Sequence, residues 1–171
     1  RRLAAALLQA LDAPGTQVGV AGDRSPIWPK GYVGSISHSR RLVAVAVARR
    51  RDVRAVGIDI EAIAEVRAVE AIESVCMRPE ERDFDAGALT RAEFATLLFS
   101  AKEAFYKCMQ PLTRVEFDFP DVTLTRIDPA AQRLELRLLR AATAEFGPGH
   151  LFQCGYRRAQ GHVYTALEIG H

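Results

Sequence analysis

Hydrophobic residues recur at helical spacing in several stretches of the chain. The predicted helices cover residues 2–11, 64–75, 78–81 and 90–109. Thr90 and Glu93 match a capping box, which places the start of the longest helix. Pro111 is expected to mark the end of that helix, because proline cannot donate the next backbone hydrogen bond.

Strands are predicted where apolar residues alternate with polar ones or form a short continuous run. The predicted strands cover residues 17–20, 42–48, 53–61, 115–119, 122–127, 134–138, 151–158 and 162–169. The run 42–48 is nearly all apolar and predicts a central strand covered on both faces, with 53–61 returning beside it. The pattern favours an α+β fold of two pseudo-equivalent halves, residues 1–85 and 86–171, each a helix on a small, mostly antiparallel sheet. We expect the site in the cleft between these halves.

Composition narrows the class of protein. The chain has 171 residues, 49% of them hydrophobic and 26% charged, which is the composition of a globular domain. A net charge of +2 is too small to argue for nucleic acid, although it suits an anionic ligand. No apolar run is long enough to predict a membrane span. The three cysteines are widely spaced, which favours a reducing cytoplasm over a disulfide framework or a zinc site.

Candidate chemistry gathers on the strand at residues 53–61. Its alternation places Asp59 and Glu61 on one face, about one pleat repeat apart, so that their oxygens can converge on one hard cation. Glu103 on the longest predicted helix would add a third carboxylate and leave room for waters and a phosphate, as Mg²⁺ prefers. Lys107 shares a helix face with Glu103, although such a pair is also the ordinary stabilising pair of a solvated helix. The residues alone therefore indicate a Mg²⁺ site suited to chemistry on a phosphoanhydride.

Two motifs resemble the signature of the 4′-phosphopantetheinyl transferases. They are VGIDIE at residues 56–61 and FSAKEAFYK at residues 99–107. Shorter motifs resemble the siderophore- and polyketide-type single-chain branch: WPKG at 28–31, GSISHS at 34–39 and PLT at 111–113. The resemblance implies a monomeric cytoplasmic enzyme in which a serine of an acyl or peptidyl carrier protein attacks the β-phosphate of coenzyme A. The carrier would gain 4′-phosphopantetheine, and adenosine 3′,5′-bisphosphate would be released.

The resemblance also implies roles for single residues. Asp59, Glu61 and Glu103 would bind Mg²⁺, or alternatively Mn²⁺, with Glu103 also the base for the carrier serine. Lys107 would neutralise the transferring phosphate, and Lys102 would either contact the leaving group or form a salt bridge elsewhere.

Further candidates lie upstream, where the resemblance implies contacts with coenzyme A. Ser37 and His38 would donate hydrogen bonds to a phosphate oxygen. Arg24 and Lys30, in the turn-rich loop 22–31, are candidates for the nucleotide, with plain surface charge as the alternative. The family's basic N-terminal region is expected to be missing, because the chain starts at Arg1 instead of a methionine.

Several alternatives stay open at this point. Phe117 and Phe119 either line a channel for the pantetheine arm or belong to the core. The arginines at 49–51 are either a solvated hairpin tip or a docking patch for an acidic partner. Two other functions compete with the transferase: a Mg²⁺-dependent hydrolase of coenzyme A or nucleotide pyrophosphates, and a catalytically silent module that binds carrier proteins.

Overall fold

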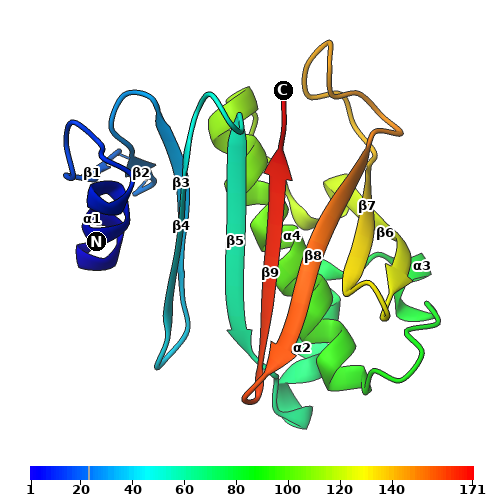
Figure 1. Ribbon diagram of the computed structural model, residues 1–171. Helices are drawn as coiled ribbons and strands as arrows, with labels where there is room; N and C mark the ends of the chain where they lie inside the picture. The colour runs from blue at the N-terminus through cyan, green and yellow to red at the C-terminus, as the bar shows by residue number, and fades with distance from the viewer. Residues whose placement is uncertain (23) are drawn as a thin grey trace.

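The computed structural model describes residues 1–22 and 24–171 of the chain. Asp23, in the predicted turn-rich loop before Arg24, lies outside the described residues. Helices and antiparallel strands are mixed along the chain, which confirms the predicted α+β class. Figure 1 shows a small N-terminal part beside a larger sheet that is backed by helices.

The first part of the chain, called here the N-terminal lobe, comprises residues 1–49. Its elements are α1 (Arg2–Ala10), β1 (Gly19–Val20), β2 (Pro26–Ile27), β3 (Tyr32–His38) and β4 (Val43–Arg49). The strands pair as two antiparallel hairpins, β1 with β2 and β3 with β4. Leu8 of α1 is fully buried in a small core with Tyr32, and Val45 and Val47 of β4 pack against that core.

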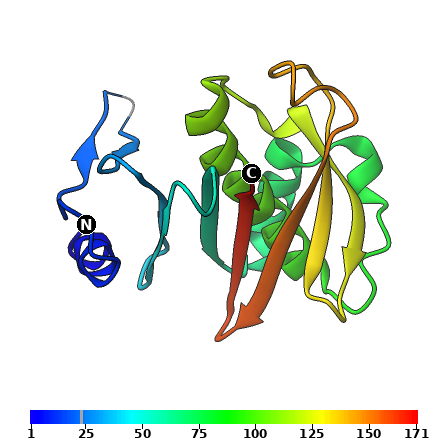
Figure 2. The same ribbon diagram turned by 45° about the horizontal axis from the view of Figure 1, so that its top comes forward.

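The remainder, called here the C-terminal body, is built on one antiparallel sheet. In the described part of the chain this sheet has the strand order β5-β9-β8-β7-β6. Its strands are β5 (Ala55–Ala62), β6 (Val122–Asp128), β7 (Arg133–Leu138), β8 (Leu151–Ala159) and β9 (His162–Ile169). The helical elements are α2 (Val66–Cys76), α3 (Pro79–Arg82), α4 (Arg91–Thr113) and the 3₁₀ turn η1 (Phe119–Asp121). Both views show α4 running behind the sheet, while the N-terminal lobe lies beyond β5 (Figure 2).

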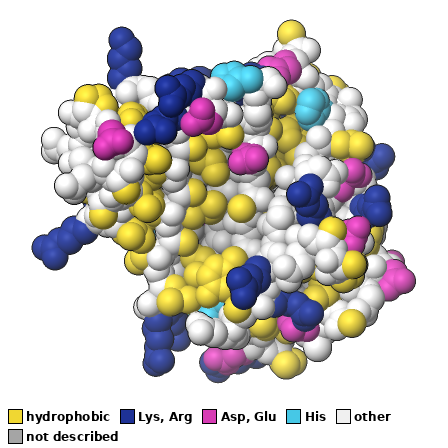
Figure 3. Space-filling view, viewed as in Figure 1, with side chains coloured by type: hydrophobic (Ala, Val, Ile, Leu, Met, Phe, Trp, Pro, Cys, Tyr) yellow, Lys and Arg dark blue, Asp and Glu magenta, His cyan; other side chains and the backbone are white. Residues whose placement is uncertain are grey.

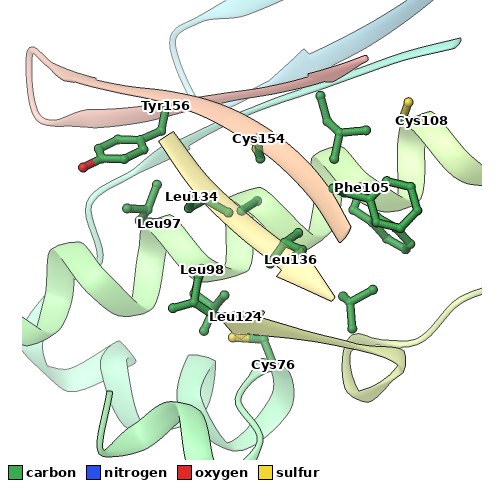
Figure 4. Packing of buried hydrophobic residues seen from close by; sticks show 14 of the residues in the cluster. Cys76, Leu97, Leu98, Phe105, Cys108, Leu124, Leu134, Leu136, Cys154 and Tyr156 are labelled. Carbon is green, nitrogen blue, oxygen red and sulfur yellow. The ribbon is translucent and has the colours of Figure 1, made fainter. Parts of the chain in front are cut away.

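The main core lies between α4 and the sheet. Leu97, Leu98 and Phe105 of α4 are almost completely buried, and they pack with leucines of β7 and with aromatic residues of β8. Figure 4 shows these side chains between the helix and the strands. Phe105 contacts Phe117 and Phe152 edge to face, with ring centroids 5.2 and 5.1 Å apart. This packing fixes which face of α4 is left for chemistry.

The long helix begins as predicted and ends later than predicted. Thr90 caps α4: its hydroxyl accepts from the backbone of Glu93, and the Glu93 carboxylate accepts from the backbone of Thr90. Pro111 does not end the helix, which continues to Thr113 and closes with Arg114 in the left-handed conformation. The Arg114 N–H bonds to the Gln110 carbonyl, so the chain passes the proline with the loss of a single donor.

Several strand predictions are wrong. Residues 115–119 form no strand and lead into η1. The apolar run 42–48 is not a central covered strand: β4 pairs with β3 alone in the described part of the chain, and its residues are half-buried or exposed. β5 lies close to β4 but forms no backbone ladder with it, since the ladder partner of β5 in the described chain is β9. The backbone ladders change between β4 and β5. β5 and α2 pack in the core of the five-stranded sheet, and α3 contacts β6 through the buried Glu81.

Serine side chains join the two parts of the molecule. β3 runs beside β5, but in the described chain the two strands share no backbone ladder. Instead, the backbone N–H groups of Ile58 and Ile60 donate to the hydroxyls of Ser35 and Ser37, at 3.0 and 3.3 Å. Hydrophobic side chains gather over this junction on the face shown in Figure 3.

A helix that crosses a lipid bilayer must be both long and apolar. Within residues 1–22 and 24–171, no helix combines the length and the apolar character that crossing a membrane would need.

Candidate active site at the junction of β3, β5 and α4

Gly57 brings α4 against β5. A Cβ atom at this position would lie 1.9 Å from the carbonyl oxygen of Ala104 and 2.6 Å from the backbone nitrogen of Cys108. The backbone of the helix therefore occupies the space that any side chain at residue 57 would need. This close approach sets Asp59, two residues further along the same face of β5, directly against α4.

Asp59 is the centre of the site. It is 3% exposed, and its Oδ1 accepts from the Ser37 hydroxyl at 2.7 Å and from Lys107 Nζ at 2.6 Å. Lys107 Nζ also lies 3.3 Å from Ser37 Oγ and 3.9 Å from Glu103 Oε2. The structure thus brings Ser37, Asp59, Glu103 and Lys107 together from β3, β5 and α4.

The carboxylates of Glu61 and Glu103 share this region. Burial is the main cause that raises the pKa of Glu61 to about 6, and the negative charges of Asp59 and Glu103 raise it further. Burial also raises the pKa of Glu103, with a smaller contribution from Asp59 and an opposing one from Lys107. These shifts arise where negative charge is crowded in a poorly hydrated place, which favours the binding of a cation.

The residues present fit a divalent metal ion in their chemistry. Asp59 Oδ2 is buried and has no hydrogen-bond partner among the described residues, although buried carboxylate oxygens are nearly always paired. Hard carboxylate oxygens are the ligands that Mg²⁺ prefers. The side chains themselves do not surround one point: within residues 1–22 and 24–171 no three His, Cys, Asp or Glu side chains form a metal-binding group. The Lys107 ammonium lies beside Asp59 instead.

Lys102 has a different place from Lys107. Its side chain is 1% exposed, and its ammonium donates to the Glu81 carboxylate at 2.7 Å and to the carbonyls of Cys76 and Phe119. Of the two roles left open for Lys102, the structure shows a salt bridge, and the side chain also lines the cavity that opens next to Glu103. Burial lowers the pKa of Lys102, and the charge of Glu81 opposes that shift.

Sequence reasoning missed Glu81, the partner of Lys102. Glu81 is completely buried, and its carboxylate also accepts the backbone N–H groups of Arg78 and Leu124. Its place at the third position of the short helix after Pro79 signals a capping carboxylate, which this residue is. That local signal does not show that Leu124 and Lys102, both distant in sequence, bury the same group.

The two residues predicted to contact a phosphate, Ser37 and His38, lie on opposite faces of β3. The Ser37 hydroxyl donates its single proton to Asp59 in this structure, so it has no second proton to donate to a phosphate. His38 is exposed at the end of β3, and strand alternation turns it to the face opposite Ser37. Arg24 and Lys30 are also exposed, in the loop around β2, where a large anion can reach them.

A cavity of roughly 360 Å³ opens next to Glu103. It is lined by α4 and by the segment that follows it, including Tyr106, Phe117 and Phe119. Phe117 packs on Phe105, and Phe119 lies 5.3 Å from Phe99 between ring centroids. The two aromatic residues therefore belong to the core and also form a wall of this cavity.

Comparison with known proteins gives the family. The sequence model of the 4′-phosphopantetheinyl transferase superfamily matches residues 55–165, and that of the 4′-phosphopantetheinyl transferase N-terminal domain matches residues 1–48. The boundary between these matches coincides with the step from β4 to β5. The chain belongs to the 4′-phosphopantetheinyl transferase superfamily.

Curated relatives agree with this assignment. The chain is 35% identical over 150 residues to 4′-phosphopantetheinyl transferase Svp of Streptomyces mobaraensis, covering 85% of this chain and 59% of the relative. It is 35% identical over 125 residues to 4′-phosphopantetheinyl transferase Npt of Nocardia iowensis, covering 73% and 55%. It is 34% identical over 128 residues to enterobactin synthase component D of Salmonella typhi, covering 74% and 51%. The chain spans about half the length of the curated relatives it matches.

Proposed function

We propose that the protein transfers 4′-phosphopantetheine from coenzyme A to a serine of an acyl or peptidyl carrier protein. The observation that carries this proposal is the buried Asp59, held by Lys107 and Ser37 next to Glu61 and Glu103, in a chain of this superfamily. The relatives named as phosphopantetheinyl transferases support the same reaction class.

The charged side chains of the site then have proposed roles in the transfer reaction. Glu103 takes the proton of the carrier serine, for which its raised pKa suits it. The serine oxygen forms a bond to the β-phosphorus of coenzyme A, and the bond between that phosphorus and the bridging oxygen breaks, releasing adenosine 3′,5′-bisphosphate. Lys107 is 26% exposed, so its ammonium can reach the transferring phosphate and offset its charge.

Asp59, Glu61 and Glu103 would hold Mg²⁺, with Mn²⁺ as the alternative. When bound, the ion supplies positive charge to the pyrophosphate oxygens as the leaving group departs. Asp59 Oδ2, which is buried and has no hydrogen-bond partner among the described residues, supports this assignment. Arg24, Lys30 and His38 are exposed, which allows them to bind the phosphates and the nucleotide of coenzyme A.

The cavity beside Glu103 is the proposed place of the pantetheine arm. Phe117 and Phe119 give it an apolar wall, and it opens next to the proposed base. The three cysteines are free and buried, which suits the proposed cytoplasmic location. We propose a monomer, because the C-terminal body buries its own core between α4 and the sheet.

The intact mass of purified apo carrier proteins, incubated with the protein, coenzyme A and Mg²⁺, tests the proposal. We expect a mass gain of one phosphopantetheine, abolished by EDTA. Glu103→Gln removes a negative ligand and the proposed base, so the rate should fall by at least about a hundredfold. Glu70→Gln, the same change at an exposed position of α2, is the matched control and should react at the normal rate.

Other outcomes would contradict the proposal. Consumption of coenzyme A without any carrier protein would favour the hydrolase. A folded protein that modifies no carrier and consumes no coenzyme A would favour the silent binding module. Near-normal transfer by Glu103→Gln would refute the role given to Glu103.

A further inference from the structure

Ser35 and Ser37 have matching positions at the junction of the two parts. Each is 3% exposed, and each hydroxyl accepts one backbone N–H of β5, from Ile58 and from Ile60 respectively. Both serines therefore satisfy donors on the edge of the five-stranded sheet that faces β3. On this ground alone their contributions to stability should be similar.

Ser37 has a second set of contacts. Its hydroxyl donates to Asp59 Oδ1 at 2.7 Å and accepts from Lys107 Nζ at 3.3 Å. With the N–H of Ile60, these contacts use the one proton and both acceptor positions of the hydroxyl. In the described part of the chain, the Ser35 side chain makes no hydrogen bond to Asp59 or Lys107.

These contacts make the two oxygens of Asp59 unequal. Oδ1 is held by Ser37 and Lys107, whereas Oδ2 is buried without a partner among the described residues. A carboxylate whose one oxygen is held cannot rotate freely, so the direction of the other oxygen is fixed as well. The hydroxyl of Ser37 lies on β3 of the N-terminal lobe, whereas Asp59 lies on β5 of the C-terminal body.

We propose that Ser37 is a positioning residue: it holds Oδ1 of Asp59 so that Oδ2 is left in place for a divalent cation. This inference rests on the metal site of the proposed function. It replaces the phosphate contact expected for Ser37 with a role exerted through Asp59. It also makes the cation site depend on the N-terminal lobe, because the hydroxyl that orients the ligand comes from that lobe.

Binding of Mn²⁺ alone, followed by the paramagnetic resonance signal of the free ion, tests this inference without coenzyme A or carrier protein. Ser37→Ala should weaken Mn²⁺ binding by about tenfold to a hundredfold, the usual cost of removing a group that orients a metal ligand. Ser35→Ala, the matched control, removes an equivalent contact with β5 and should bind Mn²⁺ as the unaltered protein does. Ser37→Thr keeps the hydroxyl and should retain most of the affinity.

The Mn²⁺ measurements distinguish failure of the Ser37 inference from failure of the metal site on which it rests. If the unaltered protein binds no Mn²⁺ or Mg²⁺, the metal site of the proposed function fails, and the inference fails with it. If the unaltered protein binds Mn²⁺ and Ser37→Ala binds equally well, the inference alone is refuted. Equal weakening by Ser35→Ala and Ser37→Ala would show loosening of the junction, which also refutes a specific role for Ser37. Circular dichroism and thermal unfolding of all variants verify that they fold.

Discussion

At the scale of single residues, two lysines on one helix differ through burial. Lys102 is 1% exposed, and its three ammonium hydrogens bond to Glu81, Cys76 and Phe119. In this structure the ammonium is therefore fully paired within the protein. Lys107, five positions further on, is 26% exposed and lies among the carboxylates of the site.

Lys102→Met should therefore destabilise the protein strongly. It leaves the fully buried Glu81 carboxylate without a countercharge, and breaking one side of a buried pair costs about 3–5 kcal/mol of the free energy of unfolding. Urea unfolding measures this loss. Arg91→Met, on the same helix as Lys102, is the control. It breaks the pair between the exposed Arg91 side chain and Glu73 of α2, and should lower the free energy of unfolding far less. Equal losses in the two variants would show that the buried pair contributes no more than a surface pair.

At the scale of elements, the packing of α4 on β5 positions the site. Thr90 and Glu93 fix where α4 begins, and the core residues of the helix fix its rotation against the sheet. Gly57 sets the distance between the two elements, because the backbone at Ala104 occupies the space of a side chain. The contact between Lys107 and Asp59 exists only at this separation.

Gly57→Ala tests that distance. Its methyl group would meet backbone atoms that cannot rotate aside, so α4 must move away from β5. We expect a loss of at least about 3 kcal/mol in the free energy of unfolding, at the upper end of overpacking costs, with loss of transferase activity. The control is Gly155→Ala on β8, where the nearest atom to the added carbon is the Ala166 carbonyl oxygen at 3.8 Å. Unfolding of Gly57→Ala at the same urea concentration as Gly155→Ala would contradict the argument.

At the scale of the whole molecule, the N-terminal lobe and the C-terminal body differ in how they are held. Within the C-terminal body, β5 to β9 are joined by backbone ladders over a large core. Between the two parts, β5 N–H groups bond to serine hydroxyls and not to a partner strand in the described chain. Few bonds and a half-buried β4 indicate that the lobe can separate locally before the body unfolds.

Amide hydrogen exchange measured by NMR should reveal this order. The amides of Ile58 and Ile60 should exchange faster than the ladder amides shared by β8 and β9, because separation of β3 exposes the former alone. Ser35→Ala should speed exchange at Ile58 further. Equal protection at both places would mean that the lobe and the body open as one cooperative unit.

Local pattern was sufficient to predict much of the fold. The helical spacing of apolar residues predicted α1, α2 and α4, and the Thr90 capping box predicted where α4 starts, because these signals act within a few residues. The turn at residues 159–161 between alternating runs predicted the β8–β9 hairpin for the same reason. The two family motifs predicted the superfamily, which the matches over residues 55–165 and 1–48 confirm.

Only the tertiary structure decided how these elements meet. The apolar run 42–48 has the composition of a central strand, yet its ladder partner in the described chain is β3 alone, because β5 pairs with β9, which lies far later in the sequence. Sequence spacing put Lys102 and Lys107 near Glu103, but burial by Glu81 and by the backbone of other elements separates their roles. The hydrogen bond from the Ser37 hydroxyl to Asp59 depends on the contact of β3 with β5, which no local signal encodes. Patterns of a few residues determine elements, whereas the charges and hydrogen bonds of the site depend on contacts that only the folded chain creates.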